Sequence, residues 1–337
     1  MAKERIKSAD FVRVISFAFI FIFHFYEELE AVTGRQTLLR HQANGNLAVM
    51  GNVLFFALSG AMLYLGYGGL TVKSGRKDIV RFYKKRWLSL FPSFLIAWGA
   101  LYLLKAVASR DLFYNGNPAS LLLSLVGLDG YMSYRITDYY IIGEWFLGAM
   151  VLIYLLYPVI NYFFSKWPVA TALGNLLLTG AVWIPGLWKI DTGRNLIVCA
   201  FCFVMGMLFM KYQKMICRKV YVNVAAIAAL VLFTVPMPNS QYGYELLAFC
   251  MMIILFFLGE RIMQNRVCDR IFTFLASFAY EVFLVHHIVI YAIQGIFASN
   301  SGIMCHVLFV GTGLISILGG FILHKISKGI VNGISKL

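Results

Sequence analysis

Ten long runs of hydrophobic residues alternate along the chain with short polar segments. Each run is close to the roughly 20 apolar residues that an α-helix needs to cross the hydrocarbon core of a bilayer. We therefore expect an all-α fold, a polytopic membrane helical bundle of about ten transmembrane helices. The predicted spans are 9–26, 46–66, 87–105, 141–164, 168–186, 194–211, 220–235, 243–259, 271–294 and 303–324.

Composition agrees with a membrane protein. Hydrophobic residues make up 61% of the 337 residues and charged residues 13%, against about 25% charged residues in an average soluble domain. The segments between the predicted spans are all short. We therefore expect a single membrane domain over 1–337, with no appended soluble domain.

The formal net charge of +14 follows the predicted topology. With the amino terminus inside, 21 of the 29 Lys and Arg residues fall in predicted cytoplasmic segments and seven in outer segments. This bias obeys the positive-inside rule and predicts a multi-pass protein of the cell (plasma) membrane with both termini cytoplasmic. The basic charge thus indicates membrane lipid as a partner, not nucleic acid.

The six cysteines predict no disulfide. Cys199 and Cys202 have CxxC spacing, but they lie in a wholly apolar run without a neighbouring acid or histidine, so packing is the expected role. We expect no metal site.

Arg13 and His24 both lie inside the first hydrophobic run, eleven positions apart. On an α-helix this separation is three turns plus about 20°, so both side chains leave the same face, roughly 16 Å apart along the axis. A cation and an imidazole are costly in lipid and should face a protein interior or a water-filled cavity. The basic start and apolar run also resemble a signal peptide, but no small-residue cleavage site follows. We expect an uncleaved span carrying part of an active site.

His24 is followed by Glu27 and Glu28 at i+3 and i+4. Either carboxylate could accept the ring N–H, fix the tautomer and raise the basicity of the ring. A histidine held in this way suits removal of a proton from a hydroxyl during acyl transfer. The alternative is a pore-facing histidine that only forms hydrogen bonds.

Three further places carry ionisable residues in or next to predicted spans. Lys85 and Arg86 precede the third span, where they either mark the cytoplasmic boundary or bind phosphate. Glu144 opens the fourth span beside Trp145, which is of a type that anchors helices at the interface. His286 lies in the ninth span, five positions after Glu281 and about 140° around the helix, so we do not expect these two to be neighbours.

Two polar segments on the predicted outer side, 27–45 and 106–140, are longer than the short turns between most of the predicted spans. The first should cap the His24 end of the first span. The second contains an apolar stretch, 121–128, that is too short to span, and we expect it to lie along the interface or to re-enter over the site.

Five motifs together resemble membrane acyltransferase family 3. They are the R-x10-H of Arg13 and His24, the FFxLSG of 55–60, the KKRxxxxxP of 84–92, the EWFL of 144–147 and the SFAYE of 277–281 with the following FLVHH. The motifs occur in family order and extend from the first predicted span to the ninth.

The resemblance implies an O-acyltransferase with acetyl-coenzyme A, or another acyl-coenzyme A, as co-substrate and no bound cofactor. It implies His24 as the catalytic histidine and Arg13 as part of the donor path, with Arg86 and Lys85 binding the donor. Supporting roles would fall to Glu28, Glu144 and His286. The thioester arm would reach past Arg13 towards His24, and the acceptor would be a cell-surface glycan or its lipid-linked precursor.

The chain departs from the family pattern at Ser89, where many members carry a second arginine. Two other classes of protein remain open on the sequence alone: a non-enzymatic transporter, and a polysaccharide polymerase or flippase. Intramembrane charges and many spans suit them too.

Overall fold

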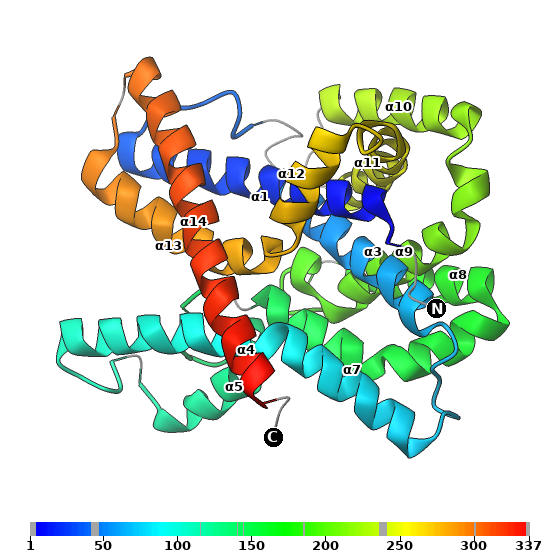
Figure 1. Ribbon diagram of the computed structural model, residues 1–337, viewed down its shortest axis with the longest axis horizontal. Coiled ribbons are helices and arrows are strands. Elements are labelled where there is room, and N and C mark those ends of the chain that lie inside the picture. The colour runs from blue at the N-terminus through cyan, green and yellow to red at the C-terminus, as the bar shows by residue number, and fades with distance from the viewer. Residues whose placement is uncertain are drawn as a thin grey trace. The chain divides into compact units, whose positions relative to one another are not determined.

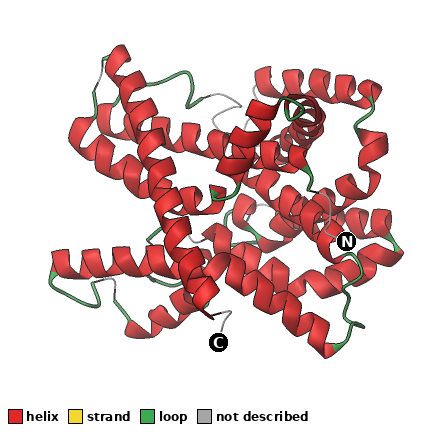
Figure 2. Ribbon diagram, in the orientation of Figure 1, coloured by secondary structure: helices red, strands yellow, loops and turns green. Residues whose placement is uncertain are grey.

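The computed structural model describes residues 5–41, 47–114, 116–139, 141–143, 145–184, 186–235, 241–299 and 301–334. Helices account for 81% of the structure, and no strand occurs among the described residues (Figure 2). The predicted all-α fold is confirmed.

The order of the elements is shown in Figure 1. The helices are α1 (Lys7–Thr33), α3 (Leu47–Tyr67), α4 (Arg76–Ser109), η1 (Pro118–Ser120), α5 (Leu121–Leu125), α6 (Asp129–Met132), α7 (Trp145–Lys166), α8 (Pro168–Val182), η2 (Thr192–Arg194), α9 (Leu196–Ile216), α10 (Lys219–Thr234), α11 (Gln241–Ile262), α12 (Arg266–Ala276), α13 (Ala279–Phe297) and α14 (Gly302–Ile334).

Eight of the described helices are long and apolar enough to cross a membrane, which confirms the predicted polytopic bundle. The other two predicted spans, 168–186 and 220–235, form the shorter apolar helices α8 and α10, of 15 and 16 residues. At 1.5 Å per residue these reach about 23 Å, less than the roughly 30 Å of a hydrocarbon core.

Contacts divide the chain into two compact units. Unit one comprises Met1–Leu65, Met205–Ala279 and Ile288–Ser316. Unit two comprises Gly66–Val204, Tyr280–His287 and Ile317–Leu337. Helices α9, α13 and α14 are each divided between the two units.

Unit one is organised around α1, which packs against α11 and α12, while α10 packs against α11 (Figure 1). Phe21, Phe25 and Tyr26 form an aromatic cluster with Phe309 of α14. Helices α9 and α3 approach so closely that a Cβ at Gly206 would overlap the Ala57 carbonyl group. Only glycine allows this contact, which uses the helix that carries the FFxLSG motif.

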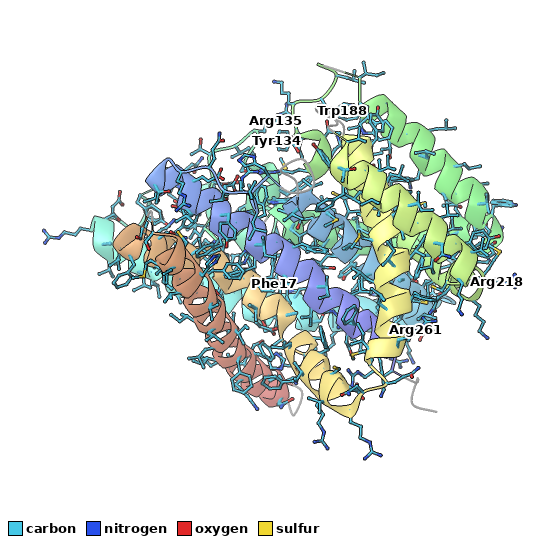
Figure 3. All side chains as sticks on the ribbon, turned by 90° about the horizontal axis from the view of Figure 1, so that it is seen from above. Phe17, Tyr134, Arg135, Trp188, Arg218 and Arg261 are labelled. Atoms are coloured by element: carbon cyan, nitrogen blue, oxygen red, sulfur yellow. The ribbon has the colours of Figure 1, made fainter. Side chains whose placement is uncertain are left out.

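Charged side chains join the start of α1 to α12. Lys7 Nζ lies 2.5 Å from the Asp269 carboxylate, and Arg5 contacts the Thr273 hydroxyl. The hydrogen bond from Lys7 lowers the pKa of Asp269 below its ordinary value. In the α10–α11 hairpin, Arg218 precedes α10 and Arg261 lies in the last turn of α11, so both lie at the same end (Figure 3). The predicted spans also place these two residues on one side of the membrane.

In unit two, α4 runs beside α7. The Tyr83 hydroxyl donates to the Leu155 carbonyl at 2.9 Å. The fully buried Asn161 amide of α7 donates to carbonyls of the loop before α4, at 2.7 Å from Leu70 O and 3.0 Å from Gly68 O. Helix α4 contains Pro92 in its interior.

A buried polar network joins α4, α13 and α14 in unit two. The Glu281 carboxylate accepts a hydrogen bond from the Ser93 hydroxyl at 2.9 Å and one from His324 Nδ1 at 3.0 Å. The Ser327 hydroxyl lies 3.0 Å from that of Ser93. All four residues are buried. The bonds satisfy polar groups that would be costly to leave unpaired away from water.

The outer segment 106–140 folds into η1, α5 and α6, and α6 packs against α7. A fully buried Asp129 accepts a hydrogen bond from Ser124 at 2.6 Å, and burial raises the pKa of this carboxyl. Burial also raises the pKa of Tyr131 to about 12. Tyr134, Arg135 and Trp188, all from predicted outer segments, lie at the same edge (Figure 3).

Replacing Glu281 should test how much the network stabilises unit two. Glu281→Ala removes the acceptor of the buried His324 and Ser93, and we expect a loss of about 3–5 kcal/mol of stability, as for other broken buried pairs. Ser327→Ala should cost only about 0.5–1.5 kcal/mol, the net contribution of one neutral hydrogen bond. Thermal unfolding of the purified variants in detergent measures both. Equal melting temperatures for the two variants would contradict a central role for the carboxylate.

Candidate functional site

His24 lies on α1 in unit one, with its side chain 21% exposed. Its Nδ1 atom is 3.3 Å from Glu27 Oε2. Because a carboxylate accepts hydrogen bonds, this contact places a ring proton on Nδ1. With its proton on Nδ1, a neutral imidazole has Nε2 as its basic atom.

A third side chain holds Glu27. Arg40 Nη2 lies 3.3 Å from Glu27 Oε1, and the Arg40 guanidinium lies over the Phe23 ring at 4.1 Å from its centroid. Arg40 belongs to the outer segment 27–45, of which residues 42–46 lie outside the described residues. The described part of this segment thus reaches back to the His24 end of α1, as the sequence predicts.

The sequence left Glu27 and Glu28 as alternative partners of His24. The contact described above is with Glu27, at i+3. Glu28 is half-buried at the next position of α1. Its supporting role stays a prediction.

Arg13 lies on the same uninterrupted helix as His24, eleven residues before it. Its Nη1 atom is 2.9 Å from Asp10 Oδ1, in an i,i+3 ion pair. Asp10 is buried and also accepts from Arg5. The Arg13 charge is therefore partly compensated within α1. Asp10 was not among the predicted site residues, although its spacing from Arg13 is that of a helical ion pair.

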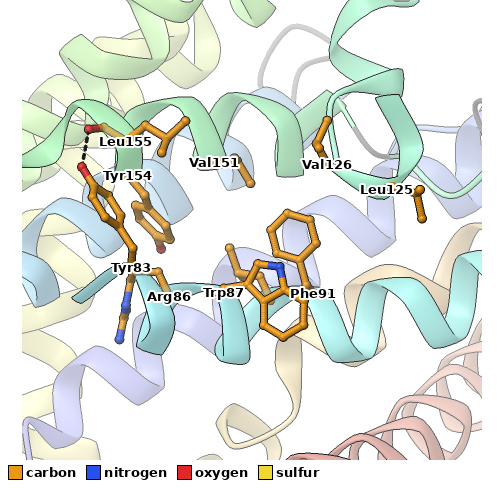
Figure 4. Close-up of a pocket in the computed structure, with 10 residues that line it drawn as sticks. Tyr83, Arg86, Trp87, Phe91, Leu125, Val126, Val151, Tyr154 and Leu155 are labelled. Carbon is orange, nitrogen blue, oxygen red and sulfur yellow. Dashed lines mark hydrogen bonds between the residues drawn. The ribbon is translucent and has the colours of Figure 1, made fainter. Parts of the chain in front are cut away.

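Arg86 lines a pocket of about 270 Å³ in unit two. Figure 4 shows Tyr83, Trp87 and Phe91 on the α4 side, Val151 and Leu155 of α7 opposite, and Val126 towards the other end. The wall is almost entirely apolar and aromatic. The stretch 121–128 of the outer segment contributes Leu125 and Val126, so it helps to enclose the pocket.

The Arg86 guanidinium pairs with no acid among the described residues, and its buried Nε atom has no hydrogen-bond partner there. It lies 5.5 Å from the Tyr67 ring centroid and 5.9 Å from that of Tyr154. Aromatic faces stabilise a cation without neutralising it. The group is thus available for bidentate binding of a phosphate or carboxylate.

Lys85 and Ser89 complete this part of α4. Lys85 is exposed, and its Nζ atom lies 5.9 Å from the Tyr67 ring centroid. The Ser89 hydroxyl donates to the Arg86 carbonyl at 2.8 Å. Ser89, which stands where many family members have arginine, therefore satisfies its hydroxyl within the helix.

His286 is fully buried on α13, in unit two. Its Nδ1 atom lies 2.5 Å from the Phe283 carbonyl, and its ring centroid is 4.3 Å from that of His287. Glu281 pairs with His324 of α14, a histidine that sequence reasoning missed. The sequence feature that could have indicated His324 is the presence of an imidazole in the last hydrophobic run. Glu144 lies outside the described residues.

The two units thus hold different chemistry. Unit one presents an imidazole held by a carboxylate, which suits proton transfer. Unit two presents an uncompensated cation beside an apolar pocket, which suits an anion attached to an apolar group.

Comparison with known proteins identifies the family. A family model described as an acyltransferase domain matches residues 6–325, nearly the whole chain. Searches of curated proteins and of solved structures each found no match. Together with the helical membrane fold, the family match shows that the chain is a membrane acyltransferase that belongs to acyltransferase family 3.

Proposed function

We propose that the protein is an O-acyltransferase of the plasma membrane, with both termini cytoplasmic. It transfers an acyl group, most simply acetyl, from cytoplasmic acyl-coenzyme A to a hydroxyl of a cell-surface polysaccharide or its lipid-linked precursor. The observation that carries the proposal is the contact of His24 with Glu27, in a chain of this family.

His24 acts as the general base. Its Nε2 atom accepts the proton of the sugar hydroxyl while Glu27 stabilises the imidazolium that forms. Arg40 keeps the Glu27 carboxylate in place. The proton then leaves with the thiol of coenzyme A, so the transfer needs no other acid or base to balance.

Arg86 and Lys85 hold the donor. The uncompensated guanidinium binds phosphate, and the apolar pocket beside it receives a less polar part of the same molecule. Arg13, paired with Asp10, contributes to the donor path with a charge already oriented by a carboxylate.

Deletion of the gene should separate the proposed function from the other two classes of protein. We expect an intact polysaccharide that lacks its acyl groups, as measured by glycan composition. Loss of the polymer would instead indicate a polymerase or flippase, and an unchanged glycan would indicate a transporter. Either result would contradict the proposal.

His24→Ala should lower kcat by about 10²–10⁴-fold, the usual contribution of a positioned general base. The affinity for a non-hydrolysable acyl-coenzyme A analogue should stay near that of the wild type, because His24 is not proposed to bind the donor. The matched control is His306→Ala, which removes an exposed histidine of α14 in unit one.

Variants of Glu27 and Glu28 test which carboxylate supports His24. Glu27→Gln should lower kcat by about ten- to a hundredfold, since it removes a charge-assisted contact worth about 1.5–3 kcal/mol. Glu28→Gln should have a smaller effect. A fully active His24→Ala protein, correctly inserted, would exclude His24 as the base.

Arg86→Ala should raise the KM for acyl-coenzyme A about ten- to a hundredfold, because one charge-assisted phosphate contact is lost. Arg86→Lys should recover part of the affinity, since the charge remains but the planar fork does not. Titration of purified protein with the non-hydrolysable analogue measures both variants directly.

Arg81→Ala is the control for topology. Arg81 is an exposed cation on the same helix, paired with Asp78 and outside the pocket. It should leave donor affinity unchanged. If Arg86→Ala and Arg81→Ala both lowered membrane insertion and neither changed affinity, Arg86 would serve topology alone.

A further inference from the structure

The α7–α8 hairpin of unit two carries a second hollow that the proposed acyl transfer does not use. It has a volume of about 350 Å³ and is open along one side. Phe163 and Trp167 lie near the turn of the hairpin, and Gly174 and Leu178 line the α8 side. With Val159 on the α7 side, the wall is mostly apolar, and Thr171 and Asn175 of α8 are its polar members. We call this hollow the hairpin groove.

Two lysines lie around the Tyr162 ring, next to Trp167 at the turn end of the hairpin groove. Lys166 Nζ lies 2.9 Å from the Tyr162 hydroxyl and 5.4 Å from the Trp167 ring centroid. Lys73, from the loop before α4, places its Nζ atom 5.4 Å from the Tyr162 ring centroid. Neither lysine pairs with an acid in the part of the chain that the structure describes.

The loop that carries Lys73 is fixed to the same hairpin. Asn161 of α7 donates to the carbonyls of Gly68 and Leu70, three to five residues before Lys73. The Thr71 amide donates to the Ser74 hydroxyl at 2.9 Å, which closes the turn around Lys73. The fold therefore holds both cations beside Tyr162, at the turn end of the hairpin, although both are exposed to solvent or lipid.

This arrangement matches one class of ligand. A positive end needs an anion, and an open apolar groove that continues from it needs a hydrocarbon chain. The Tyr162 and Trp167 rings beside the lysines are of the kind that lies at headgroup depth in a bilayer. Both lysines fall in predicted cytoplasmic segments, where anionic lipids attract basic residues.

We propose that the hairpin groove is a binding site for an anionic phospholipid of the cytoplasmic leaflet. Its phosphate lies between Lys73 and Lys166, and one acyl chain lies along the groove past Gly174. A free phosphate would leave the groove unused, and a zwitterionic lipid would not match the two uncompensated cations. The site does not depend on the proposed acyl transfer.

Gly174→Leu blocks the groove without touching the lysines. A Cβ at Gly174 meets nothing within 4 Å, so the larger side chain fills the groove and not the core. Gly180→Leu is the matched control, because Gly180 lies on the same helix, also has open space and does not line the groove. The melting temperature of both variants in lipid-free detergent should equal that of the wild type.

The double variant Lys73→Gln/Lys166→Gln removes the two cations proposed to bind the phosphate and leaves the apolar groove unchanged. Lys77→Gln/Lys328→Gln is its control, since it removes two other exposed lysines of unit two. Each cation near an anionic headgroup adds attraction that corresponds to about a fivefold change in affinity, so the first pair should weaken binding about thirtyfold.

The measurement is retention of dioleoyl phosphatidylglycerol by purified protein in uncharged detergent, followed by native mass spectrometry, with dioleoyl phosphatidylcholine as the comparison lipid. We expect one tightly retained phosphatidylglycerol per chain, lost in Gly174→Leu and in the first lysine pair and kept in both controls. Equal retention of the two lipids, or unchanged retention in Gly174→Leu and in the first lysine pair, would overturn the proposal. A change of oligomeric state in Gly174→Leu with unchanged lipid retention would instead assign the groove to a second copy of the chain.

Discussion

The Glu281 carboxylate is the constraint on which unit two most depends. An ionisable group held away from water must find partners within the protein, because lipid offers none. Glu281 meets this requirement with hydrogen bonds from α4 and α14 while it belongs to α13. One side chain therefore fixes the relative position of three helices. Apolar packing alone would tolerate more sliding, since it has little direction.

The same requirement is met locally in unit one. Asp10 and Arg13 pair within one helical turn, and so do His24 and Glu27. These pairs orient a side chain but do not join helices. Arg86 is the contrast, because it is half-buried without an acid and rests against aromatic rings. A half-buried cation that meets aromatic rings and no acid among the described residues keeps a place for an anion from outside.

Much of the fold followed from the sequence. Hydrophobic runs of the right length located the helices, and the spacing of Arg13 and His24 placed both on one helix. The choice between Glu27 and Glu28 needed side-chain geometry, because i+3 and i+4 neighbours are equally close on an ideal helix. The pairing of Glu281 with His324 could not be predicted from the sequence, because it joins positions 43 residues apart on different helices. Local periodicity says nothing about such contacts.

Pro92 makes α4 easier to bend at one point than along the rest of the helix. Proline has no amide hydrogen, so the Leu88 carbonyl one turn earlier loses its partner in the helical ladder. This weak point falls between Arg86, which lines the pocket, and Ser93, which is tied to Glu281. Bending of α4 therefore costs least between the half that lines the pocket, which Tyr83 ties to α7, and the half that Ser93 ties to Glu281. A bend at Pro92 therefore changes the direction of the pocket-lining residues relative to the buried network.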